Sequence, residues 1–303
     1  MKTRILTFSG RGLGCTQPEI LHAVAEKLSD CAALHPDLIC FPEEVLICGG
    51  DNGNPDWAAH NAAALAMFRA QAARLHANIV CGLEEPAELP GKRYNTAYFI
   101  DRAGAVIGRY RKRHLTYRAA SFGLPGSDLA VVDSDIGRVG LMICFDLGWK
   151  ADWAALADLG ADLVVWPSAY DGGFGLNALA SVHQYYIVSS TWPSGSRIIN
   201  RFGATVARGC EWESFAMADV DLRGRIYHID RQREKIDRIR AALGDRVTVT
   251  VQPGDNLFEV ASNAPDWPPE RIESEFGLMT CAEYYREATE MNDRLRAGTE
   301  DAR

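Results

Sequence analysis

The sequence predicts an α/β protein in which two mixed β-sheets pack face to face between outer helices, a four-layer α-β-β-α sandwich. Helical and strand patterns alternate up to about residue 83, and short strands joined by tight turns dominate from there to about residue 220. Several strand patterns are continuously apolar, as expected of strands that are buried on both faces. With 303 residues, of which 47% are apolar, the chain can form a core of this size.

The first part of the chain has the order βαβαβ. Arg4 to Phe8 alternates like a strand, and Thr16-Gln17-Pro18-Glu19 forms a capping box with proline just inside a helix that runs to about residue 34. The apolar segment DLICF (37–41) is a short buried strand. An Ala-rich amphipathic helix over 58–77 then leads into the strand NIVCGL (78–83).

Hairpins and short strands follow, with few helices between them. The strands that we expect here cover residues 94–101, 105–112, 129–134, 138–144, 162–166, 185–191, 196–200, 204–209 and 214–220, with helices near 153–159 and 176–185. We find no linker, repeat or low-complexity segment before about residue 220. Residues 1–260 are therefore expected to form one domain, followed by a charged helical extension over 261–303.

The charge of the chain argues against two classes of partner. A net charge of −8 and a pI near 5.4 disfavour nucleic acid and anionic membranes, because both are bound by a positive surface. No apolar stretch is long enough to span a membrane, and the start MKTRILTFSG lacks the features of a signal peptide. We therefore expect a soluble cytoplasmic protein that acts on a small molecule.

Metal and disulfide sites are not indicated. The seven histidines are dispersed, and none occurs in HxH, HExxH or a Cys/His cluster with the spacing of metal ligands. The eight cysteines are scattered without a CxxC pair, which is typical of reduced thiols. We expect no metal and no cofactor.

Three predicted strands end in polar groups that are unusual at such positions. Glu43 follows DLICFP, Lys112 lies in GRYRKRHL, and Cys144 follows GLMI. Each has an ordinary alternative interpretation: a solvated loop acid, one charge in a basic run, and a small apolar core residue. Catalytic groups nevertheless collect at strand ends, where a rigid sheet presents them to one crevice.

The blocks that contain these residues resemble the nitrilase, or carbon–nitrogen hydrolase, superfamily. The matching blocks are FPEE, YNTAYFIDRAGAVIGRYRKRHL, GRVGLMICFD and GADLVVWPSA, in family order and at family-like spacing over about residues 4–222. The resemblance implies an α-β-β-α fold and a Glu43-Lys112-Cys144 active site that attacks a C–N bond of an amide, carbamoyl or nitrile group. It also implies association of two sandwiches through their outer helices, as a homodimer or a higher homo-oligomer.

The chemistry needs these residue types. A free thiol is mostly protonated at neutral pH, so Glu43 would take its proton while Lys112 holds the thiolate. Attack on a carbonyl places negative charge on oxygen, for which the Lys112 ammonium and the backbone N–H of Phe145 are the expected donors. Glu43 would then protonate the leaving amine and activate water against the thioester.

The family pattern is incomplete, and the substrate stays open. Many members carry a second glutamate four residues before a Pro-Gly, where Ser121 stands in this chain. The Phe-Asp after Cys144 is similar to the amidase and carbamoylase branches, so we expect amide hydrolysis, with N-carbamoyl amines or amino acids as the alternative substrates. A non-catalytic metabolite-binding protein is the alternative of a different class. Candidate substrate contacts, for which core packing is an equal alternative, are Asp146, Trp149, Tyr170, Phe174 and Trp192.

Overall fold

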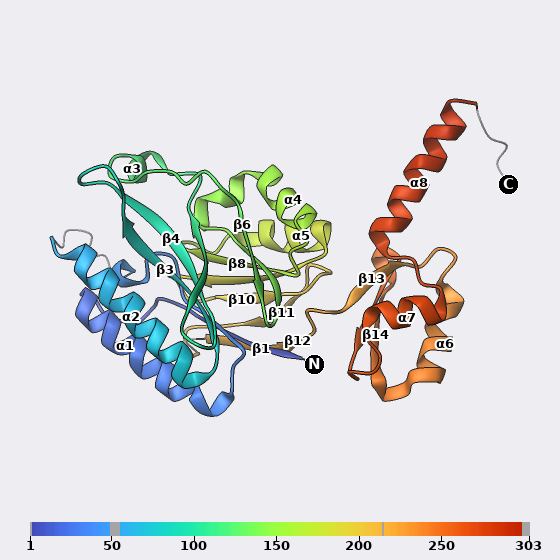
Figure 1. Cartoon of the computed structure of the whole chain (residues 1–303), viewed down its shortest axis with the longest axis horizontal. Coiled ribbons are helices and arrows are strands. Elements are labelled where there is room, and N and C mark those ends of the chain that lie inside the picture. The colour runs from blue at the N-terminus through green and yellow to red at the C-terminus, as the bar shows by residue number, and fades with distance from the viewer. Residues whose placement is uncertain (1, 49–54, 214, 299–303) are drawn as a thin grey trace. The chain divides into compact units, whose positions relative to one another are not determined.

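The computed structural model describes residues 2–48, 55–213 and 215–298. The chain divides into two compact units (Figure 1). The first is Thr3–Leu222, and the second begins at Arg223. Within the described residues, no helix is both long and apolar enough to cross a membrane.

The first unit contains two mixed sheets, as the sequence predicts. Among the described residues, one has the strand order β12-β1-β2-β3-β4-β5 and the other β11-β10-β9-β8-β7-β6. The strands of the first sheet are β1 (Thr3–Phe8), β2 (Leu38–Cys40), β3 (Asn78–Pro86), β4 (Arg93–Ile100), β5 (Val106–Arg111) and β12 (Phe215–Val220). The strands of the second are β6 (Ala130–Ser134), β7 (Gly137–Leu141), β8 (Leu163–Ser168), β9 (Tyr186–Thr191), β10 (Arg197–Ile199) and β11 (Thr205–Arg208). In each sheet three consecutive central strands run parallel, β1-β2-β3 and β7-β8-β9, and the outer pairs are antiparallel.

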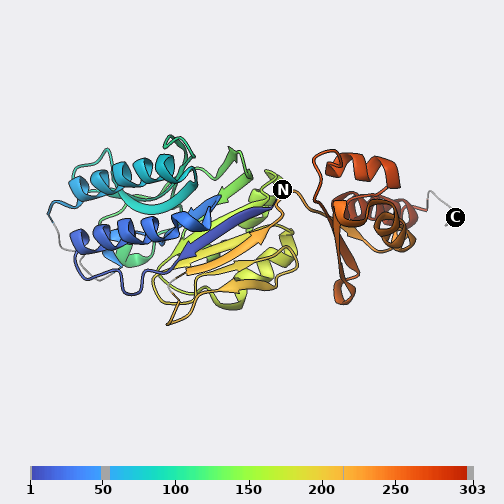
Figure 2. The same cartoon turned by 90° about the horizontal axis from the view of Figure 1, so that it is seen from below.

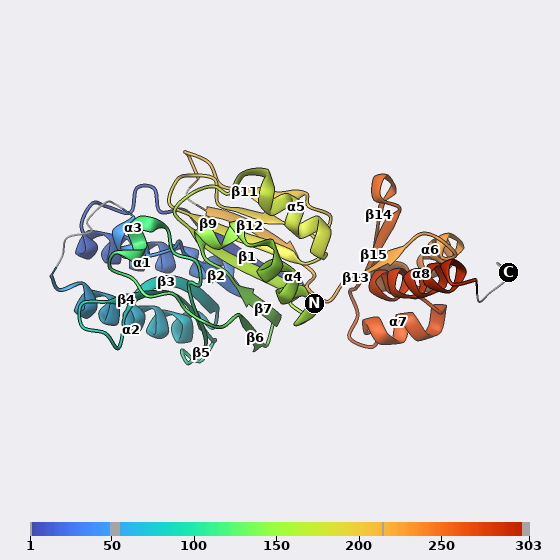
Figure 3. The same cartoon turned by 90° about the horizontal axis from the view of Figure 1, so that it is seen from above.

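Helices cover the outer face of each sheet. The helices of this unit are α1 (Gln17–Asp30) with η1 (Cys31–Leu34), η2 (Val45–Ile47), α2 (Trp57–Leu75), α3 (Tyr117–Ala120), η3 (Cys144–Gly148), α4 (Lys150–Asp158) and α5 (Gly173–His183). Figures 1 and 2 show α1 and α2 side by side along the first sheet, and Figure 3 shows α4 and α5 on the second. The predicted capping box is present, because the Glu19 carboxylate accepts the backbone N–H of Thr16 at 3.1 Å.

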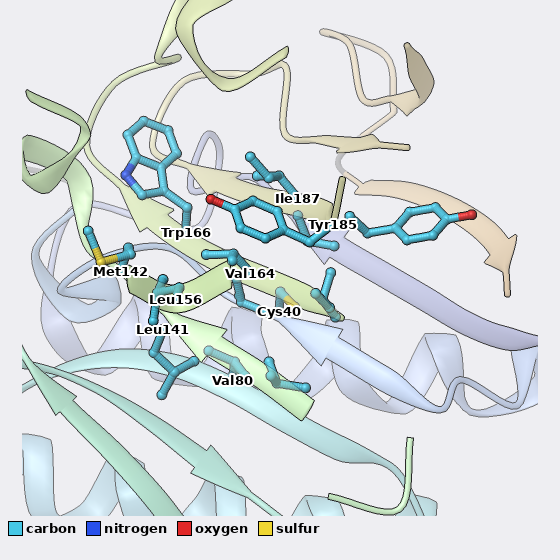
Figure 4. Close-up of a cluster of buried hydrophobic side chains, with 14 of the residues drawn as sticks. Cys40, Val80, Leu141, Met142, Leu156, Val164, Trp166, Tyr185 and Ile187 are labelled. Atoms are coloured by element: carbon cyan, nitrogen blue, oxygen red, sulfur yellow. The ribbon is translucent and has the colours of Figure 1, made fainter. Parts of the chain in front are cut away.

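Alternation along the strands builds two apolar layers. On β2, Leu38 and Cys40 point toward the second sheet, whereas Ile39 joins the layer beneath α1 and α2. Figure 4 shows Cys40 and Val80 from the first sheet meeting Leu141 and other residues of the second. The strand DLICF is thus buried on both faces, as predicted, and the four-layer sandwich is confirmed.

The second unit has a core of its own. It contains an antiparallel sheet of β13 (Arg225–His228), β15 (Leu257–Ser262) and β14 (Val247–Gln252), the helices α6 (Arg233–Leu243), α7 (Pro269–Phe276) and α8 (Cys281–Arg296), and the short turns η4 (Gly244–Arg246) and η5 (Pro253–Asp255). Phe258 and Val260 of β15 lie in one apolar cluster with Ile272 and Phe276 of α7. The division of the chain therefore lies at 222/223 and not at the expected 260/261. The residues beyond 260 are helical, as expected, but they complete a core that begins near residue 225.

Candidate active site

The two sheets bring three strand ends into one buried site. Glu43 lies three residues after β2, Lys112 directly follows β5, and Cys144 lies three residues after β7. Their exposed fractions are 3%, 4% and 7%. The Lys112 ammonium donates a hydrogen bond to Glu43 Oε1 at 2.6 Å. The residues predicted from the sequence as catalytic thus lie within one buried cluster.

Two glycines allow the backbone to pass close to this pair. A Cβ on Gly82 of β3 would lie 2.6 Å from the Cα of Glu43, and the Gly82 N–H donates to the Pro42 carbonyl at 3.2 Å. A Cβ on Gly126 would lie 2.2 Å from the Arg111 carbonyl oxygen, while the Gly126 N–H donates to the Lys112 carbonyl at 2.9 Å. Neither site has room for a larger residue unless the backbone shifts.

Both carboxylate oxygens of Glu43 are held by further donors. Oε1 accepts the Asn95 amide at 2.7 Å, and Oε2 accepts the backbone N–H of Ala169 at 2.8 Å. The Trp192 indole donates to the Glu43 carbonyl at 2.6 Å. Sequence reasoning missed Asn95 and Ala169. The signal for Asn95 was a polar residue within the otherwise apolar strand YNTAYFID, next to a catalytic strand end.

Cys144 begins the tight turn η3 in an unusual conformation. Its φ is +47°, in the left-handed region that costs a non-glycine residue about 1–2 kcal/mol. The Cys144 carbonyl accepts hydrogen bonds from the indole of Trp166 at 3.1 Å and the hydroxyl of Tyr170 at 3.4 Å. These contacts hold the turn, so the thiol is presented from a fixed backbone.

The electrostatics of the site keep the thiol protonated. Burial, followed by the negative charge of Glu43, raises the pKa of Cys144 to about 12, against the opposing charge of Lys112. Burial lowers the pKa of Lys112, but the charges of Glu43 and Cys144 outweigh burial and leave that pKa raised. A neutral thiol beside a protonated Lys112 is therefore the resting arrangement at neutral pH.

The basic run around Lys112 is not one charged patch. Arg111 donates to Glu85 at 2.8 Å and lies over the Tyr94 ring, and Arg113 pairs with Asp152 at 2.8 Å. These two side chains each meet an acid outside the site, whereas Lys112 between them points inward, as alternation along an extended segment requires.

The three residues share a cavity of about 510 Å³. It is lined by Glu43, Glu44, Ile47, Glu84, Arg93, Asn95, Lys112, Leu115, Thr116, Arg118, Ala119, Ser121, Phe122, Gly123, Cys144, Ala169 and Trp192. Its volume suits a small molecule. The described residues contain no group of three or more His, Cys, Asp or Glu side chains placed to hold a metal ion.

The candidate substrate contacts separate into one that lines the cavity and four that do not. Trp192 lines it. Phe174 is 81% exposed, Trp149 stacks on the His114 ring at 3.9 Å, and the Tyr170 ring packs edge-on against Trp166. Trp149 and Tyr170 lie in irregular segments, which have no fixed alternation, and Phe174 lies in the first turn of α5, so the direction of these side chains could not be read from their positions.

Asp146 does not line the cavity, and its carboxylate is instead hydrogen-bonded within the protein. Its Oδ2 accepts the Tyr110 hydroxyl at 2.8 Å and the Ile143 N–H at 3.0 Å, and its Oδ1 accepts the His114 N–H at 3.0 Å. Burial raises its pKa to about 6, although these hydrogen bonds oppose the rise. Asp146 therefore ties the nucleophile turn to the segment that follows Lys112.

Ser121 lies at the cavity wall, at the position of the second glutamate in the family pattern. Its hydroxyl donates to the Arg118 carbonyl at 2.7 Å, just after α3. Lys112 is held by Glu43 instead, and Glu43 by Asn95. The pair is therefore positioned without an acid at residue 121.

These features define an α-β-β-α sandwich protein with a cysteine beside a glutamate–lysine pair in one cavity. Residues 15–225 match the family model described as Carbon-nitrogen hydrolase. The chain therefore belongs to the carbon–nitrogen hydrolase family, and the resemblance that the sequence motifs indicate is confirmed.

Similar proteins agree with this assignment. The chain is 27% identical over 158 residues to a deaminated glutathione amidase of Bos taurus, covering 43% of this chain and 48% of that protein. It is 26% identical over 164 residues to an omega-amidase of Homo sapiens, covering 46% and 59%. The match thus spans about half the length of these curated relatives.

Solved structures share the fold. An amidase from Nesterenkonia sp. has a TM-score of 0.63 at 22% identity, covering 72% of this chain and 90% of that one. A carbon–nitrogen hydrolase from Helicobacter pylori G27 has a TM-score of 0.65 at 18% identity, covering 81% and 94%.

Proposed function

We propose that this protein hydrolyses a non-peptide C–N bond of a small amide through a thioester on Cys144. The observation that carries the proposal is the 2.6 Å contact between Lys112 and Glu43 in the cavity that also contains the thiol. Relatives named as amidases support the choice of an amide substrate. The expected cytoplasmic location and homo-oligomer stay predictions.

The first half-reaction forms the thioester. The Cys144 sulfur attacks the amide carbon while Glu43 accepts the thiol proton, because a thiol of pKa about 12 needs a base to react at neutral pH. Negative charge develops on the carbonyl oxygen, where Lys112 and the backbone N–H of Phe145 are the donors. Glu43 then passes its proton to the nitrogen, the C–N bond breaks, and ammonia or an amine leaves.

The second half-reaction restores the enzyme. Glu43 accepts a proton from a water molecule whose oxygen attacks the thioester carbon. The C–S bond breaks, the sulfur recovers its proton, and a carboxylic acid leaves. The net reaction adds one water across the C–N bond. Glu43 transfers the protons in both half-reactions.

The test is substrate-dependent acylation of Cys144. Amides, carbamoyl compounds and nitriles are screened for ammonia release, and the enzyme is quenched during turnover and analysed by peptide mass spectrometry. We expect an acyl group on Cys144, and loss of turnover by several orders of magnitude in Cys144→Ala. Carbon dioxide released together with ammonia would identify a carbamoyl substrate instead.

Alkylation of thiols would identify the nucleophile less clearly than acylation by a substrate does. Cys15 and Cys210 are exposed, so iodoacetamide reaches them whatever the function of Cys144. In a mutant of the Nesterenkonia amidase, acrylamide is attached to the active-site cysteine, which makes it a useful probe. A Cys15→Ser/Cys210→Ser variant provides the clean background. Acylation at another cysteine, or turnover retained in Cys144→Ala, would contradict the mechanism.

A further inference from the structure

The cavity wall carries a carboxylate that the mechanism does not use. Glu84 lies near the end of β3, is 4% exposed, and accepts a hydrogen bond from Arg93 Nη1 at 2.7 Å through its Oε1. Its Oε2 is buried and has no hydrogen-bond partner. Its backbone N–H donates to Asn61 Oδ1 at 2.8 Å, which fixes its place on the wall. Buried polar atoms in native structures find partners, so this oxygen points to a donor on a ligand.

Glu44 adds a second acid to the same wall. It follows Glu43 directly, is half-buried, and has a φ of +42°. Burial, followed by the charges of Glu43 and Glu84, raises the pKa of Glu44 to about 8. At neutral pH this carboxyl therefore holds a proton, which a bound cation would displace.

The charges on the wall favour a cation. Lys112 balances Glu43 and Arg93 balances Glu84, so Glu44, once it gives up its proton to a bound cation, has no buried cation beside it among the residues that line the cavity. The remaining lining cation, Arg118, is on an exposed residue of α3. A carboxylate in this part of the cavity would face two acids, whereas an ammonium group brings donors to both.

Arg93 supports this arrangement and does not compete with it. Its guanidinium lies over the Trp57 and Phe122 rings, at 4.9 and 4.7 Å from their centroids. Its charge is taken up by Glu84, which accepts a hydrogen bond from Arg93 Nη1 at 2.7 Å. The pairing keeps the Glu84 carboxylate in place.

We propose that Glu84 and Glu44 bind an ammonium group, so that the preferred substrates are amides with an amino group on the acyl side. This proposal rests on the proposed function, because the cavity that holds the two acids also holds Cys144. It names two specificity-determining residues, neither of which takes part in the chemical steps.

The test uses amides that differ only in their far end. One series is δ-aminovaleramide, hexanamide and adipamate, and a shorter one is β-alaninamide, butanamide and succinamate. We expect kcat/KM of the amino-amide to exceed that of the alkyl amide at least tenfold in one series. Glu84→Gln should lower this preference at least tenfold, because it raises the KM of the amino-amide. Glu44→Gln should change the preference in the same direction.

The control is Glu88→Gln. Glu88 carries an exposed carboxylate outside the cavity, paired with Arg111 at 3.7 Å, so the preference should stay unchanged. Circular dichroism checks that each variant folds. Equal or better turnover of the alkyl or carboxylate amides would overturn the proposal, as would a Glu84→Gln variant that loses kcat equally on every substrate.

Binding to Cys144→Ala separates this proposal from the proposed function. Calorimetry with the same compounds needs no turnover. Tighter binding of the amino-amides without any hydrolysis by the wild type would support the ammonium site and count against the amidase function. Hydrolysis by the wild type without preferential binding of amino-amides would support the amidase function and count against the ammonium site.

Discussion

Lys112 is flanked by basic residues, yet the direction of its side chain gives it a different environment from theirs. Lys112 is buried against Glu43, whereas Arg113 is partly exposed and pairs with Asp152. If only the sum of charge mattered, exchanging lysine for arginine would be neutral at both positions. A compact ammonium at one point cannot be replaced by a planar guanidinium.

We therefore predict that Lys112→Arg loses about 10²- to 10³-fold in kcat, the usual effect of removing one oxyanion donor. Because the charge of Lys112 lowers the pKa of Cys144, its displacement should raise that pKa further. The rate of ammonia release and the pH dependence of thiol alkylation measure the two effects. The matched control is Arg113→Lys, with both variants compared by circular dichroism. Similar activities would mean that Lys112 is not an oxyanion donor.

At the scale of elements, β3 positions Glu43 through the absence of a side chain. A methyl group on Gly82 would lie 2.6 Å from Glu43 Cα and 2.8 Å from the Glu44 nitrogen. The segment after β2 must then move, and a displacement of about 1 Å in a catalytic group can cost on the order of 10²-fold in rate.

We predict that Gly82→Ala loses about 10²-fold in kcat/KM and about 1–3 kcal/mol in the free energy of unfolding, the usual cost of overpacking. Gly175→Ala in α5 is the control, because its added methyl would meet only Leu147, at 3.7 Å. Ammonia release and urea denaturation measure the two effects. A Gly82→Ala variant with normal activity would show that the approach of β3 does not set the position of Glu43.

Elements also explain what the sequence could predict. The strands β2 and β7 follow from apolar runs and β5 follows from its hairpin with β4, so the three residues at or just beyond their ends could be placed together in advance. Asp146 lies on the tight turn η3 and Trp149 directly follows it. The two-residue alternation of a strand no longer applies there, and both residues were misplaced for that reason. Glu84 could have been found, since a charged residue that directly follows the apolar run NIVCGL is a signal of burial with a partner.

At the scale of the whole chain, the division into two units follows from where the apolar clusters close. Leu222 belongs to the cluster between the two large sheets, and Tyr227 belongs to the cluster of the second unit. The sequence shows no linker there, and the charged residues beyond 260 resemble a tail. The apolar residues Ile272 and Phe276, spaced four apart, indicated instead that this segment packs against a core, because they form the buried face of α7.

Truncation distinguishes the two boundaries. A chain that ends at Leu222 keeps both large sheets and their helices, and we predict that it melts in one cooperative transition. A chain that ends at Val260 keeps β13 and most of β15 but loses Ile272 and Phe276, whose burial is worth about 1.5–3 kcal/mol for each side chain. The apolar face of its remaining sheet is then uncovered, so this longer chain should bind the dye ANS and elute as aggregates in size-exclusion chromatography. If the longer chain behaved like the full-length protein and the shorter one aggregated, the boundary would lie near residue 260 after all.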